Sequence, residues 1–337
     1  MKIGINALFL IPKEVGGTET YLCEILRELA ETHKQVELVL FTNLENDELL
    51  RKHFGRFSQV SFRLLNFKAT NRYARIIREQ TELPFTARRA GVDVLWSPGY
   101  TAPFFSPCPQ VVTIHDMQYK THPEDLTPLA LFVTDVLVRM AAKRCRRVIT
   151  VSNFAKSEIL RHTGTRAEFI DVTYEAADPE FGRRLSDSER DVVLKKILPD
   201  AKPYLLYVAN TYPHKNAHAL LDAFCHLQME IPHNLVIVGK PRLGEPCLQR
   251  VLADLKDRSR LVRVEYASRI DLIALYQGAS LFVFPSLYEG FGLPVLEAMM
   301  SGVPVVAARM ASIPEGGGEG ICFFVPDKDA DRIFKFR

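Results

Sequence analysis

The sequence predicts an α/β protein made of two doubly wound domains, each with a parallel sheet that helices cover on both faces. Short runs of apolar and β-branched residues alternate with longer segments of helical periodicity. The short runs are apolar throughout, which is typical of strands that are buried on both faces. The alternation stops near residue 175 and restarts after residue 200, and this interruption indicates two domains.

In the first half of the chain, six apolar runs have the length of strands and four segments have the spacing of helices. The predicted strands cover residues 2–7, 36–42, 60–64, 94–97, 111–114 and 148–151. The predicted helices cover residues 19–32, 72–90, 129–145 and 154–162.

The second half repeats this order. The predicted strands cover residues 204–209, 235–238, 262–266, 281–285 and 303–307. The predicted helices cover residues 217–229, 245–257, 272–278 and 295–301, with Asp271 expected as the N-cap of the third.

The two halves are joined by a polar, charge-rich segment without an apolar run of strand length. We therefore predict a Rossmann-like domain over 1–175, a linker over 176–202 and a second Rossmann-like domain over 203–337. In open α/β sheets, ligands bind at the carboxyl ends of strands, near a switch in strand order. Each motif described below follows a predicted strand, so two sheets facing each other across a cleft would bring the motifs together.

Composition and charge argue against several classes of protein. The net charge of +3 is small, so we expect no nucleic-acid partner. The six cysteines are scattered and form no C-x-x-C pair, which is typical of buried thiols in a reducing compartment. No apolar stretch reaches the roughly 18 residues of a membrane span, so we expect a cytoplasmic protein. Histidines lack the spacing of metal ligands, and the D-x-D match at Asp327 and Asp329 is interpreted as a polar turn, so no metal is expected.

The segment SLYEGFGLPVLE, residues 286–297, raises the first functional hypothesis. It follows the apolar run LFVFP, and its Pro294 suits the first turn of a helix, where the missing amide would have no helical partner. The amides of such a turn can point at an anion, and glycine lets the backbone approach a phosphate closely. The expected phosphate-binding residues are Gly290, Phe291, Gly292 and Leu293.

Two carboxylates flank this loop, eight positions apart. Glu297, about one turn inside the predicted helix, could accept both hydroxyls of a ribose. Glu289 lies before the turn and would be close to a sugar attached beyond a diphosphate. For either residue alone the alternative is an exposed acid, which the helix dipole would favour at Glu297.

The E-x7-E spacing of Glu289 and Glu297 resembles the signature of retaining glycosyltransferases of family 4, which have the two-domain GT-B fold. The stretches VGGTETY, TIHDMQY, ITVSNFAKSEI, YVANTYPHKN and SGVPVVAA extend the resemblance over most of the chain. The resemblance implies transfer of a sugar from a nucleotide donor with retention of the anomeric configuration. It assigns the first domain to the acceptor and the second to the nucleotide sugar.

Two motifs of the first domain enter this hypothesis. Gly16 and Gly17 follow the first strand and could let the backbone approach the donor phosphate or the acceptor; the alternative is a plain turn with Thr18 as helix cap. His115 follows the run VVTI, where an imidazole can bond a sugar hydroxyl, and the resemblance implies contact with the donor sugar near the reaction centre. Asp116 is expected to support the loop.

Lys215 follows the first strand of the second domain and would neutralise the diphosphate and stabilise the leaving nucleotide. The alternative is a solvated loop lysine. The family usually has an arginine before this lysine, in the pattern P-R-K-N, whereas His214 stands here. Arginine is a permanently charged fork and histidine is charged only part of the time near neutral pH, so we expect the substitution to affect donor affinity or its pH dependence.

The predicted helix 72–90 carries Arg72, Arg75 and Arg78 on one face. Many members of the family act on lipid-linked acceptors, and a basic helix suits an anionic leaflet. We therefore add a peripheral contact at the inner face of the membrane to the expected cytoplasmic location. The alternative is a solvated helix face.

The resemblance implies a hexosyltransferase that uses a GDP- or UDP-linked sugar, and a glycan or lipid-linked acceptor. The stretch TIHDMQYKTHPE is similar to mannosyl-type members that build surface polysaccharides, which favours GDP-mannose. Two alternatives stay open: a weak or inactive relative that only binds nucleotide sugar, and another enzyme on the same fold, such as an epimerase or a phosphorylase. Family members continue into a helix that returns to the first domain, and we expect this helix to be missing from a chain that stops at Arg337.

Overall fold

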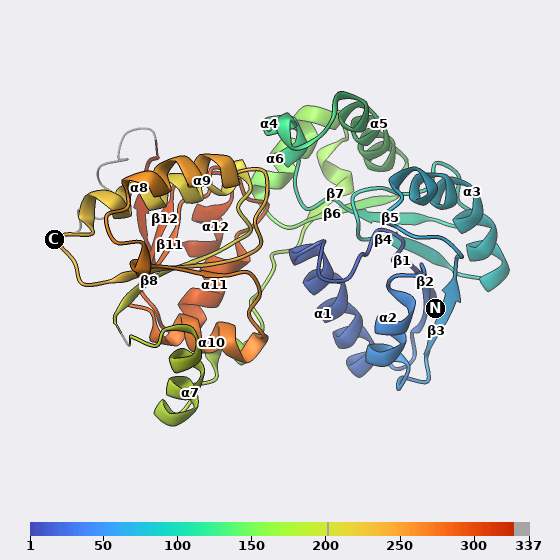
Figure 1. Cartoon of the computed structure of the whole chain (residues 1–337). Coiled ribbons are helices and arrows are strands. Elements are labelled where there is room, and N and C mark those ends of the chain that lie inside the picture. Colours follow the sequence, from blue (N-terminus) through green and yellow to red (C-terminus); the bar gives the residue numbers. More distant parts are fainter. Residues whose placement is uncertain (201, 327–337) are drawn as a thin grey trace. The chain divides into compact units, whose positions relative to one another are not determined.

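The computed structural model describes residues 1–200 and 202–326, apart from the side chain of Asp125, and it divides into two units, Met1–Tyr174 and Glu175–Arg337 (Figure 1). Each unit contains one parallel sheet with helices on both faces, of seven strands in the first unit and six in the second. The predicted fold class of two Rossmann-like, doubly wound domains is confirmed. The expected absence of a return helix and the D-x-D stretch lie outside the described residues.

The first sheet has the strand order β3-β2-β1-β4-β5-β6-β7. Its strands are β1 (Lys2–Asn6), β2 (Glu37–Thr42), β3 (Val60–Leu64), β4 (Val94–Ser97), β5 (Gln110–Thr113), β6 (Arg147–Thr150) and β7 (Ile170–Val172). The helices are α1 (Gly17–Thr32), α2 (Asp47–Phe54), α3 (Arg72–Ala90), α4 (Gln118–Thr121), α5 (Pro128–Arg144) and α6 (Asn153–Thr163). In Figure 1, α1 and α2 lie on one side of this sheet, and α3 and α5 lie on the other.

Apolar side chains on both faces of the first sheet explain why its strands have no polar face. On one side, Leu22 and Leu26 of α1 pack in a cluster with Leu40 of β2. On the other side, Leu83 of α3 packs in a cluster with Val39 of the same strand. Alternate residues of one strand therefore enter two different cores, which requires the continuous apolar run seen in the sequence.

The second sheet has the order β10-β9-β8-β11-β12-β13. Its strands are β8 (Tyr204–Val208), β9 (Asn234–Val238), β10 (Leu261–Val264), β11 (Leu281–Phe284), β12 (Val305–Ala308) and β13 (Cys322–Phe324). The helices are α7 (Asp187–Ile197), α8 (Ala217–Leu227), α9 (Glu245–Val251), α10 (Arg269–Gly278), α11 (Leu293–Met300) and α12 (Ile313–Gly317).

The segment predicted as a linker, 176–202, is folded onto the second unit. It contains α7, which packs against α10, and its side chains Phe181, Leu185 and Leu198 are buried in the apolar cluster of the second sheet. The contact pattern accordingly divides the chain after Tyr174.

The predicted cap of α10 is wrong by three residues. Ser268 is the N-cap: its hydroxyl accepts a hydrogen bond from the Asp271 amide, and the Asp271 side chain accepts one from the Ser268 amide in return. This reciprocal capping box satisfies two amides of the first turn, so the helix begins earlier than the apolar spacing alone predicts.

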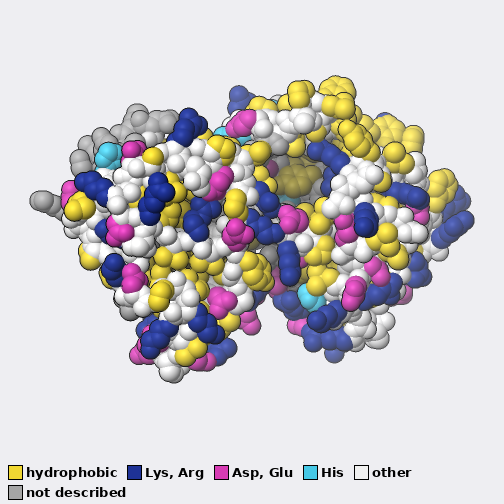
Figure 2. Space-filling model, in the orientation of Figure 1, with side chains coloured by type: hydrophobic (Ala, Val, Ile, Leu, Met, Phe, Trp, Pro, Cys, Tyr) yellow, Lys and Arg dark blue, Asp and Glu magenta, His cyan; other side chains and the backbone are white. Residues whose placement is uncertain are grey.

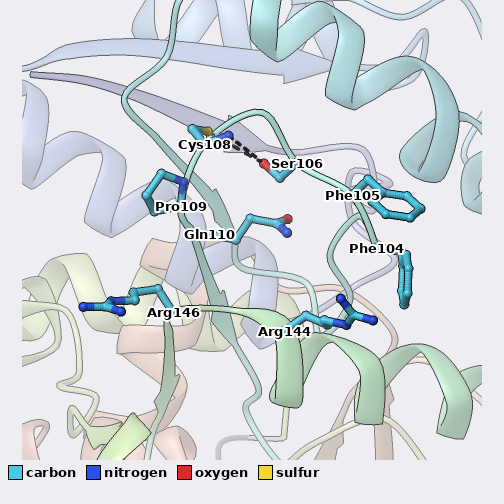
Figure 3. A pocket seen from close by; sticks show the side chains of 8 residues that line it. All are labelled: Phe104, Phe105, Ser106, Cys108, Pro109, Gln110, Arg144 and Arg146. Carbon is cyan, nitrogen blue, oxygen red and sulfur yellow. Dashed lines mark hydrogen bonds between the residues drawn. The ribbon is translucent and has the colours of Figure 1, made fainter.

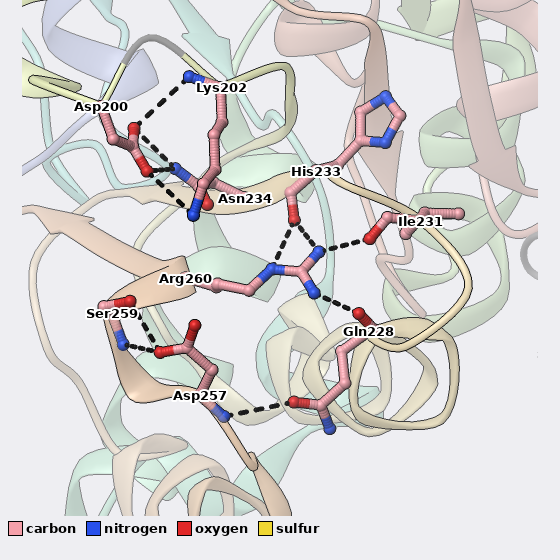
Figure 4. A network of polar contacts seen from close by, with 9 residues as sticks. All are labelled: Asp200, Lys202, Gln228, Ile231, His233, Asn234, Asp257, Ser259 and Arg260. Carbon is pink, nitrogen blue, oxygen red and sulfur yellow. Dashed lines mark hydrogen bonds and ion pairs between the residues drawn. The ribbon is translucent and has the colours of Figure 1, made fainter.

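A buried arginine fixes the entry into β9 and β10. Arg260 donates from Nε to the His233 carbonyl at 3.1 Å and from Nη2 to the Ile231 carbonyl at 2.7 Å, and it also bonds the Gln228 carbonyl (Figure 4). Asn234, the first residue of β9, donates to both carboxylate oxygens of Asp200 at 3.1 Å. These bonds satisfy carbonyls that no strand or helix pairs, so they stabilise the end of the sheet opposite the predicted site.

Candidate active site

The strand order of the second sheet creates a switch point between β8 and β11. The chain passes from β8 outward to β9 and β10, and then returns to the other side of β8 with β11. The loops that follow β8 and β11 therefore leave the sheet side by side, at the place where open α/β sheets bind ligands. Lys215 lies in the first of these loops and Glu289 in the second.

The structure pairs these two residues. The Nζ of Lys215 lies 2.7 Å and 2.8 Å from the two carboxylate oxygens of Glu289. Only 20% of the Lys215 side chain and 9% of the Glu289 side chain are exposed, so the alternative of a solvated loop lysine is wrong. The backbone is held as well, because Ser312 Oγ donates to the Glu289 carbonyl at 2.9 Å and Tyr207 Oη donates to the Lys215 carbonyl at 3.3 Å.

The glycine loop ends at a position whose backbone conformation suits glycine better than any other residue. Gly292 has φ 98° and forms the N-cap of α11, which has Pro294 in its first turn as predicted. No side chain caps this helix start, in contrast to α10. The positive end of the helix dipole therefore follows Glu289 closely in the sequence, and no capping side chain screens it. Phe291 is buried, so its ring is not available to a ligand.

Glu297 lies one turn inside α11 and is half-buried. Its Oε2 accepts a hydrogen bond from Tyr276 Oη at 3.0 Å, and Tyr276 is fully buried under it. Burial raises the pKa of Glu297 above its ordinary value of 4.5, while the Tyr276 hydrogen bond and the charge of Arg269 act in the opposite direction. A carboxylate has about four acceptor positions. One donor therefore leaves Glu297 able to accept further hydroxyls.

The structure places His214 in the interior. Its ring is buried and stacks on Tyr212, with ring centroids 5.6 Å apart and planes 18° from parallel. Its carbonyl accepts a hydrogen bond from the amide of Leu287 at 2.8 Å, which ties the loop after β8 to the loop after β11. The effect of His214 on donor affinity stays a prediction.

In the first unit, different groups lie at the carboxyl ends of the strands. Gly16 is the N-cap of α1 with φ 59°, and Gly17 is the first helical residue. Thr18 lies inside the helix, so the alternative in which Thr18 is the cap is wrong. An added Cβ at Gly16 or Gly17 would meet no atom within 4 Å, so the backbone there is open to an approaching group.

His115 follows β5 and is enclosed by aromatic rings. It is buried, its Nε2 lies 3.1 Å from the Pro98 carbonyl, and its ring meets Tyr21 edge-on at 4.7 Å between centroids. Tyr100 lies 5.4 Å away on another side. Asp116 accepts a hydrogen bond from the Gln118 amide at 3.0 Å, which confirms its expected role in holding the loop.

Sequence reasoning missed three polar groups at these strand ends. Tyr276 and Ser312 support Glu297 and Glu289, as described above. The third is Glu79 of α3, which is buried at the β1–β4 switch point of the first sheet and accepts from Asn6 Nδ2 at 2.7 Å. Thr101 Oγ1 donates to both oxygens of Glu79, at 3.1 Å and 2.9 Å, and burial raises the pKa of this carboxyl. A buried tyrosine that needs a partner for its hydroxyl is the one signal that could have indicated Tyr276.

An open pocket of about 380 Å³ lies at the opposite edge of the first sheet, where β5 begins (Figure 3). Its lining residues are Phe104, Phe105, Ser106, Cys108, Pro109, Gln110, Arg144 and Arg146. None of the residues predicted for the site lines it, so we assign it no role in the proposed chemistry.

In the described part of the chain, no group of three or more His, Cys, Asp or Glu side chains could hold a metal ion. Among residues 1–200 and 202–326, no helix combines the length and the apolar character needed to cross a membrane.

Two family models match the chain. The model described as Glycosyltransferase Family 4 matches residues 15–181, and the model described as Glycosyl transferases group 1 matches residues 202–335. Together they cover both units, including the Gly16–Gly17 turn and the E-x7-E segment. The chain belongs to the family 4, group 1 glycosyltransferases and has their GT-B fold.

Among curated relatives, the O-antigen chain mannosyltransferase B of Escherichia coli is 34% identical over 226 residues, which is 66% of this chain. The O-antigen chain mannosyltransferase RfbU of Salmonella typhimurium is 29% identical over 220 residues, or 65% of this chain. The matched part spans 58% of the length of each of these relatives.

A solved structure of Anabaena HepE in complex with UDP and glucose superposes with a TM-score of 0.74 at 22% identity, covering 98% of this chain and 87% of that one. The structure of WaaG, a glycosyltransferase involved in lipopolysaccharide biosynthesis, has a TM-score of 0.70 at 14% identity and covers 96% of this chain and 85% of that one. At these identities the likeness concerns the fold.

Proposed function

We propose that the protein is a retaining glycosyltransferase that moves mannose from GDP-mannose to a glycan or lipid-linked acceptor in surface polysaccharide synthesis. The names of the two O-antigen mannosyltransferases favour mannose. The structural neighbour that holds UDP and glucose supports a nucleotide-diphosphate sugar as the general class of donor. No metal is required in this proposal, so transfer should persist in the presence of EDTA.

The observation that carries the proposal is the pairing of Lys215 with Glu289 at the β8–β11 switch point, next to the helix that Gly292 opens and that holds Glu297. A lysine and a helix start suit a diphosphate. A carboxylate with unused acceptor positions suits the ribose hydroxyls. The predicted donor-binding set is Gly16, Gly17, His214, Lys215, Gly290, Phe291, Gly292, Leu293 and Glu297.

In the proposed reaction, the bond between the sugar C1 and the diphosphate oxygen breaks while the acceptor oxygen bonds to C1 on the same face. The proton of the acceptor hydroxyl passes to the leaving phosphate oxygen. No protein nucleophile is needed, so the chain contributes position and charge. Lys215 offsets the charge that grows on the leaving phosphate, and Glu289 and His115 orient the sugar.

The ion pair has a consequence for donor entry. In the structure, Glu289 holds Lys215 through two oxygens. An incoming diphosphate must share or take over this lysine, and Glu289 then has acceptor positions for the hydroxyls of the sugar. Donor binding is thereby coupled to the release of the carboxylate that the sugar needs.

The second candidate function is a nucleotide-sugar-binding relative with weak or no turnover. The buried and stacked His214 favours it, because a ring held in this way does not supply the arginine fork that the family usually has.

A two-part experiment separates these functions. Ligands that bind only the native state raise its melting temperature, so the purified protein is first screened with GDP-mannose, GDP, UDP-glucose and UDP. The stabilising donor is then supplied with a radiolabelled sugar and a lipid-linked oligosaccharide. Stabilisation by GDP-mannose with labelled product supports the transferase, whereas stabilisation without product for any donor favours the binding-only relative. No stabilisation by any nucleotide contradicts both.

A further inference from the structure

We infer that the outer face of α3, α5 and the loop between β4 and β5 docks the first unit on an anionic membrane surface. This inference deepens the proposed function by naming where a lipid-linked acceptor would be met. Lipid binding itself does not depend on sugar transfer, so the two can fail separately. The face differs from the arginine face that the sequence suggested.

Large apolar side chains point outward along both helices. On α3, Tyr73, Ile77 and Phe85 are each at least 60% exposed, and their spacing of four and eight residues places them on one side of the helix. On α5, Leu129 and Phe132 are 58% and 67% exposed, and Val136 continues the row one turn later. Phe105, in the loop before β5, is the most exposed of the group. We call these seven side chains the outer apolar face.

The members of this face belong to one surface. Both helices lie on the same side of the first sheet (Figure 1). Arg72 of α3 donates to the Ala130 carbonyl and to Thr134 of α5, which joins the helices at their first turns. Farther along, the Phe104 amide donates to Gln80 of α3 at 2.8 Å, and Arg144 of α5 lies 4.2 Å from the Phe104 ring centroid. The loop therefore bridges the two helices.

The three arginines of the predicted basic face of α3 have partners within the first unit. Arg72 is turned toward α5, and Arg78 pairs with Glu82. Arg75 is half-buried, and this desolvation lowers the pKa of its guanidinium, while the charge of the buried Glu79 acts in the opposite direction. The charges of Arg72, Arg75 and Arg78 are therefore engaged in part by groups of the same unit, and a membrane contact through them stays a prediction.

A different set of cations lies at the C-terminal ends of the two helices that carry the outer apolar face. Within the described residues, five exposed basic side chains of this region form no ion pair: Arg88, Arg89, Lys143, Arg144 and Arg146. The acidic side chains of the two helices are engaged, since Glu82 pairs with Arg78 and Asp135 pairs with Lys120 and Arg139. Figure 2 shows hydrophobic side chains gathered over α5, with Lys and Arg side chains on the surface of the first unit nearby.

The exposed apolar side chains and the nearby basic side chains, which form no ion pair within the described part of the chain, together indicate that this face binds a lipid surface. Helices that lie in a bilayer interface bury apolar side chains among the acyl chains and place Lys and Arg among anionic headgroups. A second copy of the chain is a poorer partner, because a two-fold interface would place the same unpaired cations opposite each other. Charge complementarity therefore favours an anionic leaflet.

The test is sedimentation of the full-length protein with vesicles of phosphatidylcholine, with and without phosphatidylglycerol. The double variant Ile77→Asp/Phe132→Asp changes only exposed side chains, and circular dichroism with a melting curve checks its fold. The matched control is Val192→Asp/Met229→Asp, which places the same charges at exposed apolar positions of the second unit. We expect the wild type and the control to bind anionic vesicles and the first variant to lose at least about tenfold in affinity.

A second variant, Arg88→Glu/Arg89→Glu, tests the charge. Each basic residue near an anionic surface contributes roughly fivefold to binding, so this variant should lose more than tenfold on anionic vesicles, and added salt should weaken wild-type binding. Absence of wild-type binding to anionic vesicles overturns the inference, as does unchanged binding by Ile77→Asp/Phe132→Asp. A wild-type dimer in analytical ultracentrifugation that this variant converts to monomer, without vesicle binding, assigns the face to a second copy instead.

Discussion

The two sheets have equivalent switch points, β1–β4 in the first unit and β8–β11 in the second, and the carboxylates found there have opposite environments. At β1–β4, Glu79 is buried and accepts hydrogen bonds from Asn6 Nδ2 and from the hydroxyl of Thr101, which its two oxygens share. At β8–β11, Glu289 is bound by the flexible cation Lys215, and Glu297 accepts a hydrogen bond from Tyr276. The hydrogen bonds of Glu79 come from neutral side chains, with the charge of Arg75 acting on it as well, whereas Glu289 is bonded directly by a cation and Glu297 keeps acceptor positions for a ligand.

This difference separates a structural carboxylate from ligand-binding ones. Neutral donors that bond a buried carboxylate stabilise one conformation, and its burial keeps ligands away from it. An ion pair next to a glycine-opened helix can exchange its partner for a phosphate, because lysine is a point charge on a flexible stem. The predictions below test whether the two switch points differ in this way.

The largest effect is expected for Glu289→Gln. Loss of the carboxylate that orients the sugar should lower transfer by about 10²–10³-fold. Affinity for GDP should stay within about threefold of wild type, because glutamine still offers Lys215 an acceptor and no longer competes with phosphate through charge. Initial rates with labelled donor and calorimetry with GDP measure the two quantities. Equal losses in both would place Glu289 on the nucleotide and not on the sugar.

Lys215→Met should act on binding instead. A hydrogen bond to a charged group contributes about 1.5–3 kcal/mol, so GDP affinity should fall roughly 10- to 100-fold. Because Glu289 loses its partner and stays largely buried, the melting temperature should also fall. The double variant Lys215→Met/Glu289→Gln should recover part of that stability without recovering GDP affinity. Undiminished GDP affinity in Lys215→Met would remove the proposed diphosphate contact.

Tyr276→Phe is expected to have a smaller effect that is confined to the ribose. Tyr276 Oη holds Glu297 at 3.0 Å, and without it the carboxylate is less well oriented and its pKa rises further. GDP affinity should fall about five- to tenfold, whereas affinity for 2′,3′-dideoxy-GDP should not change. The pH below which wild-type affinity declines should lie above 4.5, because burial raises the pKa of Glu297, and it should move upward in the variant. Equal losses for both nucleotides would indicate general loss of packing.

Glu79→Gln should leave nucleotide binding and transfer unchanged and alter only stability. Burial raises the pKa of Glu79 in the native state, so its contribution to the free energy of unfolding is fully present below the unfolded-state pKa and is lost as pH rises through the native value. The Glu79 carboxyl should therefore make the wild type less stable across that window, by about 1.4 kcal/mol for each pH unit between its unfolded and native pKa values. The variant should lack this part of the decline and keep only the part that comes from Glu297, whose pKa is also raised. Urea titrations at several pH values measure this decline. Any loss of GDP affinity in this variant would contradict the contrast between the switch points.

Much of this arrangement could be predicted from the sequence. Every predicted strand lies within two residues of an observed one, because buried parallel strands are apolar without interruption. The missed strands β7 and β13 have only three residues each, too few for such a run to stand out. Helix α7 was missed because its polar sequence buries little surface of its own, although Leu185 and Leu198 on either side of it are buried.

For the site, the motifs placed Lys215 and Glu289 correctly at strand ends, but their direct pairing depends on the order of strands, which no local pattern contains. The partners Tyr276 and Ser312 come from segments that look like ordinary helix and loop, and their roles arise only through the fold. Conversely, the arginines at 72, 75 and 78 have a clear helical pattern, but the contact of Arg72 with α5 depends on the packing of two helices that no local pattern contains.

The central claim is that the β8–β11 switch point binds a nucleoside diphosphate through Lys215 and Glu297, and a crystal structure of the protein soaked with GDP tests it most directly. The account predicts Lys215 Nζ within hydrogen-bond distance of a phosphate oxygen, the bidentate contact with Glu289 broken or shared, and Glu297 bonded to the ribose hydroxyls while Tyr276 still holds its other oxygen. GDP bound elsewhere, or bound here with Lys215 still closed on Glu289 and Glu297 facing away from the ribose, would contradict it.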